Sequence, residues 1–266
     1  MKQCRHPVEV ASDDGDVLKA ALLYQREVTA THEAGHAIAA YLLTRAACPG
    51  YGWPFDNIRI VTTEEIATTG HMVGYEDELG HVQASFPNYQ ETLFDKDERV
   101  LRPGDLYFAA QQGETALALR RAFAEADAII SMAGPAAEAI KFIIDEGGEP
   151  DPDYWWSKAI DDISADLDKV HAVAEDFAAS MAAGDKRRYR RAMNGFWCRL
   201  ERRTRHIMEQ PGTKAAISAL ADALLERSFI EEEVAAKIIV GAMHGYPRVR
   251  FAWLREAVKA HRKGGR

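Results

Sequence analysis

The sequence predicts a mainly α-helical domain that carries one small β-hairpin. Apolar residues recur at helical spacing from about Val17 to Ala47, and a nearly continuous helical pattern begins at about Leu106. Only one stretch, beginning with "NIRIVTTEE" at 57–65, alternates apolar and polar residues as a half-buried strand does. Together these observations indicate one helical domain rather than a string of modules.

The domain organisation follows from the distribution of polar and irregular sequence. Residues 1–18 are polar and are expected to form a loosely ordered N-terminal segment. Residues 19–245 are expected to form the main domain, in which residues 77–125 are a partly irregular insertion. Residues 246–266 are expected to form a C-terminal helical tail.

Within the main domain, turn-forming residues mark where each element ends. The first helix ends at the Pro and Gly residues of 49–54, and the strand at 57–65 pairs with a second strand, "TGHMVGYE", at 69–76. The remaining elements are helices, and this hairpin is the only β structure expected. Helix breaks are expected at Gly134-Pro135, at 145–155, at Gly184, at Pro211-Gly212 and at 245–247.

The composition is that of an ordinary soluble globular protein. The chain has 266 residues, of which 47% are hydrophobic and 28% charged, and its formal net charge is −8. Such an acidic chain is not drawn to nucleic acid or to an anionic membrane, so neither is an expected partner. The longest weakly polar run, 128–144, is shorter than the about 20 apolar residues of a membrane span. Three scattered cysteines and the lack of a signal-peptide pattern favour a cytoplasmic location.

The stretch "THEAGHAIAAYLL" at 31–43 contains the main candidate site. On a helix, His32 and His36 share one stripe with Val28, so both imidazoles face the core. Residues at i and i+4 lie about 5 to 6 Å apart at Cβ, which lets two ring nitrogens reach one Zn²⁺. Glu33 then lies beside the ion without binding it, where it can take a proton from the attacking water. The alternative is a pair of core histidines with satisfied hydrogen bonds.

A catalytic zinc site needs a third protein ligand. A third histidine of the extended motif is excluded, because its glycine and histidine positions are Ala39 and Leu42. A downstream Glu or Asp remains. In the acidic helix 159–177, Asp166 falls inside the apolar stripe, whereas Asp162 lies at its edge. A buried carboxylate needs a cation or a metal as its partner, so Asp166 is either the ligand or one half of a salt bridge.

Four segments resemble the peptidase domain of the FtsH family of ATP-dependent zinc metalloproteases. They are "VTATHEAGHA" at 28–37, "SMAGPAAEAI" at 131–140, "SADLDKVHAVAE" at 164–175 and the helices of 204–239. The resemblance covers about residues 20 to 240. It implies His32, His36 and Asp166 as zinc ligands, Glu33 as the catalytic base, and Glu138 as the residue that orients a histidine ring.

The sequence also departs from that family. No G-x-x-x-x-G-K-[ST] motif occurs, and only 31 residues precede His32, so neither an ATPase module nor a membrane anchor is expected. Pro135 stands where the family has an arginine, and Ala139 stands where it has a second acidic residue. The chain therefore resembles a stand-alone FtsH-like peptidase that lacks the ATPase.

The predicted function is a zinc-dependent endopeptidase that cleaves unfolded or extended polypeptide without an ATPase of its own. Met72, Val73 and Gly74, on the strand that borders the cleft, are the expected substrate-binding residues, through backbone hydrogen bonds to an added peptide strand. A homo-oligomer and a separate ATPase partner are both compatible with the resemblance. The alternative functions are a regulator or adaptor with a structural zinc site, and a peptidase that cleaves a single partner.

Three further features are expected to have structural roles. The basic segment 185–206 is interpreted as a solvated helix face rather than a nucleic-acid surface. Trp155 and Trp156 are expected to fix their loop to the core. His71 and His81 lie near the candidate site in sequence and are not expected to bind metal.

Overall fold

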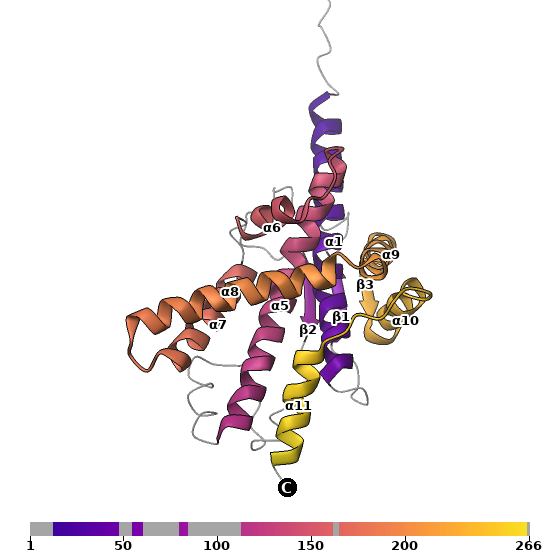
Figure 1. Cartoon of the computed structure of the whole chain (residues 1–266). Helices are drawn as coiled ribbons and strands as arrows, with labels where there is room; N and C mark the ends of the chain where they lie inside the picture. The colour runs from indigo at the N-terminus through magenta and orange to yellow at the C-terminus, as the bar shows by residue number, and fades with distance from the viewer. Residues whose placement is uncertain (1–12, 48–54, 61–79, 85–112, 162–164, 265–266) are drawn as a thin grey trace, which may run out of the picture.

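The computed structural model describes residues 13–47, 55–60, 80–84, 113–161 and 165–264. It confirms a mainly helical protein with a small antiparallel strand pair (Figure 1). The helices are α1 (Asp13–Ala47), α5 (Glu114–Asp145), α6 (Pro152–Ile160), α7 (Ala165–Ala182), α8 (Lys186–Met208), α9 (Pro211–Arg227), α10 (Glu232–Ala242) and α11 (Ala252–Gly264). The strands are β1 (Phe55–Ile60), β2 (Gly80–Ala84) and β3 (Phe229–Glu231).

Helix α1 is the central element, and it packs against α5, α9 and the sheet. Its core-facing residues are mostly small, and the fully buried ones include Ala34 and Ala37. Gly35 brings α5 close, because a Cβ at this position would lie 2.9 Å from Cβ of Ala137 and 3.0 Å from the carbonyl carbon of Ala133. The N-terminal half of α1 is also held, since Arg26 donates hydrogen bonds to the Leu225 carbonyl and to Oγ of Ser228, each at 2.8 Å.

Helix α5 continues through Gly134 and Pro135, so the predicted break at this position is wrong. Pro135 has no N–H for the carbonyl of Ser131, and a proline inside a helix costs about 3 kcal/mol. Packing offsets this cost, because α1, α7 and α11 all lie against α5 and both residues are buried. The other predicted breaks coincide with helix ends, at Asp145, Ala182, Met208 and Ala242.

The sheet has the strand order β2-β1-β3, with both pairs antiparallel. Ile58 of β1 is opposite Val82 of β2 and Ile230 of β3, and Ile58 is fully buried. The predicted second strand, 69–76, lies outside the described residues, whereas β2 lies within the predicted insertion 77–125. The short strand β3 was not predicted, because its three residues become a strand only through their pairing with β1.

Helices α7 and α8 form an antiparallel pair that extends to one side of the molecule (Figure 1). Most of the basic residues of α8 are exposed, as expected for a solvated face. Arg199 and Arg203 instead reach the core side and form ion pairs with the buried carboxylate of Glu125 on α5. A buried carboxylate needs such cationic partners, so these two contacts fix α8 onto α5.

The ends of the chain are helical where the structure describes them. Helix α1 begins at Asp13, within the segment expected to be loosely ordered, and α11 packs against α5 through the buried side chains of Leu254 and Val258. The domain boundaries at 18 and 245 stay predictions. Among the described helices, none has both the length and the apolar character that a bilayer crossing needs.

Candidate metal centre

Three side chains from distant parts of the sequence meet between α1 and α7. Nε2 of His32 lies 3.0 Å from Nε2 of His36, and Oδ2 of Asp166 lies 3.2 Å from the first nitrogen and 2.9 Å from the second. Ligands bound at about 2.0 to 2.1 Å to a tetrahedral zinc ion lie about 3.3 Å apart. The observed triangle is close to that size, so the cluster can hold a metal ion.

Local structure explains why these three atoms point inward. His32 and His36 are one turn apart on α1, and their rings meet edge to face with centroids 4.7 Å apart. Asp166 lies in the first turn of α7, where the helix dipole favours a carboxylate. Its second oxygen, Oδ1, accepts a hydrogen bond from the exposed Nζ of Lys169 at 3.2 Å, which leaves Oδ2 facing the imidazoles.

The outer nitrogens of both rings are held by α5. Nδ1 of His36 donates to the carbonyl oxygen of Ile130 at 2.7 Å, and because a carbonyl can only accept, the proton must be on Nδ1. The lone pair of a neutral His36 is therefore on Nε2, inside the cluster. Nδ1 of His32 lies 3.0 Å from Oε2 of Glu138, a carboxylate–histidine pair of the kind that orients metal ligands. Glu138 therefore lies where it can orient the ring of His32.

The electrostatics of the cluster are those of a site made for a cation. Burial lowers the pKa of His32, but hydrogen bonds to Asp166 and Glu138 outweigh it and raise this pKa to about 10. Burial raises the pKa of Asp166, but hydrogen bonds to the two histidines outweigh it and hold this pKa below its usual range. A metal ion between these atoms would displace the proton that Nε2 of His32 shares with Asp166, because imidazoles that bind a metal are neutral.

Gly134 leaves space beside the inner nitrogens of His32 and His36. A Cβ on this residue would lie 2.7 Å from Nε2 of His32 and would also overlap the ring of His36. The backbone of α5 therefore passes the two ligating nitrogens at a point where any side chain would fill the space between them. The donor set and this space together fit a small divalent cation.

The remaining predicted site residues have different outcomes. Glu33 is buried on α1, and its negative charge is among the causes that raise the pKa of His32. Met72, Val73 and Gly74 lie outside the described residues, as do Asp162 and His71. His81 is in β2, where its backbone pairs with Arg59 of β1. Trp155 and Trp156 are buried in α6, in agreement with a role in fixing this region.

Sequence reasoning missed Gly134 and the carbonyl of Ile130. The carbonyl has no sequence signal, since every residue carries one. Gly134 had a signal, a glycine beside a proline in a helical pattern, but the same pair is typical of a helix break. Only the long-range packing of α5 against α1 shows that the glycine provides space for the site.

Asp166→Asn is expected to weaken metal binding by at least about 100-fold, which exceeds the usual loss for residues behind the ligands. The variant replaces a charged carboxylate ligand by a neutral amide. Zinc affinity can be measured by competition with a chromogenic chelator. Asp168→Asn, at an exposed position two residues along the same helix, is the matched control and should bind like the parent. Equal affinity in all three proteins would exclude Asp166 as a ligand.

Glu138→Ala is expected to weaken zinc binding about 10- to 100-fold, because Nδ1 of His32 loses the acceptor that orients its ring. Glu138→Gln retains a carbonyl acceptor and should recover most of the affinity. The same chelator competition distinguishes the two variants. Identical losses in both would mean that the carboxylate charge, rather than ring orientation, is what matters.

No family model matches the chain, and no curated protein matches it. The resemblance of the four segments to the FtsH family therefore stays a prediction.

Proposed function

We propose that the chain is a zinc-dependent endopeptidase that hydrolyses peptide bonds in unfolded or extended polypeptide, without an ATPase of its own. The main support for this proposal is that His32, His36 and Asp166 lie close together and that the buried Glu33 is next to His32 in the sequence. Two imidazoles and one carboxylate are typical of catalytic zinc sites, in which the fourth position stays open.

The donor types of the cluster support zinc as the metal. Imidazole nitrogen suits zinc, whereas an all-oxygen set would suit magnesium or calcium. Zinc bound in such a site supplies a Lewis acid that polarises a carbonyl group and makes water more acidic. The hydrogen bond from Nδ1 of His36 to the Ile130 carbonyl supports this assignment, because it presents a lone pair on Nε2.

Glu33 is the proposed general base. It follows His32 directly, so on α1 its side chain is turned about 100° from the imidazole and does not compete for the ion. Its carboxylate would accept a proton from the attacking water and return it to the nitrogen of the departing amine. A purely structural zinc site needs no general base beside its ligands. This favours the enzyme over a regulator or adaptor.

Strand β2 is the proposed support for the substrate backbone. Within the described part of the sheet, β2 pairs with β1 on one side only, and it also contacts α1. An extended peptide can add to such an edge through backbone hydrogen bonds. Unfolded segments meet this requirement, and a folded protein without an exposed extended segment does not.

Metal analysis combined with a casein digest tests the proposal. The purified protein is expected to bind one zinc ion and to degrade casein, and chelation should stop the degradation. A protein without bound zinc would contradict the proposal. Zinc binding without any turnover of casein would favour the alternatives, a structural site or a peptidase dedicated to a single partner.

A further inference from the structure

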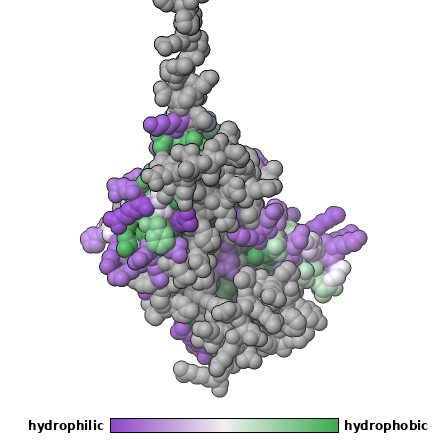
Figure 2. Space-filling model, turned by 180° about the vertical axis from the view of Figure 1, so that it is seen from behind, coloured by the Kyte–Doolittle hydropathy of each residue, from purple (hydrophilic) through white to green (hydrophobic). Residues whose placement is uncertain are grey.

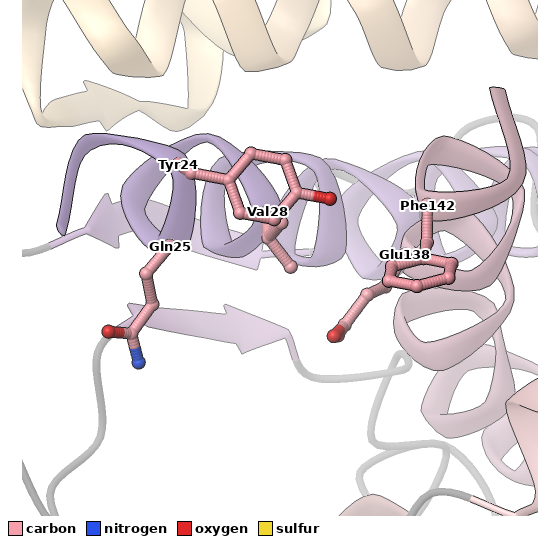
Figure 3. A pocket seen from close by; sticks show the side chains of 5 residues that line it. All are labelled: Tyr24, Gln25, Val28, Glu138 and Phe142. Atoms are coloured by element: carbon pink, nitrogen blue, oxygen red, sulfur yellow. The ribbon is translucent and has the colours of Figure 1, made fainter. Parts of the chain in front are cut away.

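A groove lies between α1 and α5, directly beside the candidate metal centre. It is lined by Tyr24, Gln25 and Val28 of α1 and by Glu138 and Phe142 of α5, and its volume is about 190 Å³. Figure 3 shows the side chains of Tyr24 and Val28 opposite those of Glu138 and Phe142, with the Glu138 carboxylate directed into the space between the helices. Glu138 therefore belongs both to the groove and to the His32 hydrogen bond.

The groove lies at a distance from the metal centre that suits a substrate side chain. Val28 is one helical turn before His32 on the same stripe, a rise of about 6 Å along α1. An extended peptide advances about 3.3 Å per residue. A peptide placed along α1 with its scissile bond at the centre would therefore have a side chain about two residues away over the groove.

The two aromatic rings that line the groove, Tyr24 and Phe142, each have a lysine ammonium group nearby. Nζ of Lys158 lies 3.4 Å from the ring centroid of Phe142, and Nζ of Lys141 lies 5.8 Å from that of Tyr24. Neither lysine is among the residues that line the groove. Lys141 is itself fixed by an ion pair with Asp145 at 3.0 Å. Cation–π contacts of this kind hold the rings in place without filling the groove.

The size and polarity of the groove select the kind of side chain it can take. A cavity of about 150 Å³ lined by apolar side chains is large enough for benzene, so this groove accommodates one large side chain. Its exposed lining is mainly apolar, which favours aliphatic and aromatic groups. The carboxylate of Glu138 repels an acidic side chain, which would also lose hydration on entering.

We propose that this groove is the subsite that selects one large apolar residue, Leu or Phe, in an extended polypeptide substrate. The selected residue lies about two positions from the hydrolysed bond. This inference rests on the proposed function and adds a substrate class to it. Val28, Tyr24 and Phe142 are the residues that determine the preference, and none of them belongs to the group of candidate metal ligands.

Peptide binding to the zinc-loaded Glu33→Gln protein tests the groove apart from catalysis. The probes are short fluorescent glycine–serine peptides that carry a single Phe, Leu, Ala or Asp, and binding is measured by fluorescence polarisation. The Phe and Leu peptides are expected to bind at least about tenfold more tightly than the Ala and Asp peptides. Adding Val28→Phe fills the groove and should remove this difference. Val240→Phe, on an exposed site of α10, is the matched control and should keep it.

Cleavage sites in casein give a second measurement. Mass spectrometry of the fragments should show large apolar residues enriched at one position near the cut bond in the parent and in Val240→Phe, and lost in Val28→Phe. Equal binding of all four peptides, or an unchanged preference in Val28→Phe that still binds zinc, would overturn the subsite and leave the peptidase intact. A protein that selects Phe and Leu peptides but cuts no casein would support the groove while contradicting the proposed function.

Discussion

Glu33→Gln is expected to reduce casein cleavage by at least about 100-fold while leaving zinc content unchanged. Glutamine has nearly the shape of glutamate, so it fills the same buried position on α1. It carries no negative charge and cannot accept the proton of the attacking water. The cluster of His32, His36 and Asp166 does not include Glu33, so the ion should stay.

Two measurements on the same sample decide this result. Initial rates of casein cleavage report the base, and metal analysis of the purified variant reports the ligands. Glu175→Gln, at an exposed position of α7 about 13 Å along the helix from Asp166, removes the same charge and should retain full activity. Full activity in Glu33→Gln would exclude Glu33 as the base, and loss of zinc would show that it supports the ion directly.

Gly134→Ala is expected to abolish zinc binding although it adds only one methyl group. The new Cβ would lie 2.7 Å from Nε2 of His32 and would overlap the His36 ring, so it occupies the space of the ion. Alanine ordinarily stabilises a helix by about 1 kcal/mol relative to glycine. Loss of zinc in this variant would therefore be a local steric effect and not a weakening of α5.

Gly241→Ala is the matched control for this substitution. Gly241 is also helical, but a Cβ there meets nothing within 4 Å, so this variant should bind zinc like the parent. Circular dichroism verifies that both variants keep their helices, and chelator competition gives their zinc affinities. Parent-like affinity in Gly134→Ala would show that α5 is farther from the ligands than the structure places it.

Much of the site could be predicted because helical periodicity reports which side of a helix is buried. His36 is buried and His32 half-buried on α1, and the carboxylate of Asp166 lies beside both of them from α7. Helical spacing alone could not show that α1 and α7 meet, because that depends on packing between residues more than 100 positions apart. The stripe and the resemblance independently selected the same aspartate.

The remaining features depend on long-range contacts that a local pattern does not encode. Pro135 looks like a helix end, and only packing on α1, α7 and α11 keeps α5 continuous. β3 is too short for alternation to be recognised, and β2 lies in a stretch without strong periodicity. The groove formed by Tyr24 and Phe142 likewise needs both helices to be in place before it exists.

The crossing of α1 and α5 bears on which cations this protein can distinguish. At Gly134 the backbone of α5 lies close to Nε2 of both His32 and His36, so on this side the space for an ion can widen only if α5 moves away from α1. Calcium prefers about 6 to 8 oxygen donors at 2.3 to 2.6 Å and would need that widening. Gly134, which has no side chain, would then limit the size of the ion that binds here and so exclude ions as large as calcium.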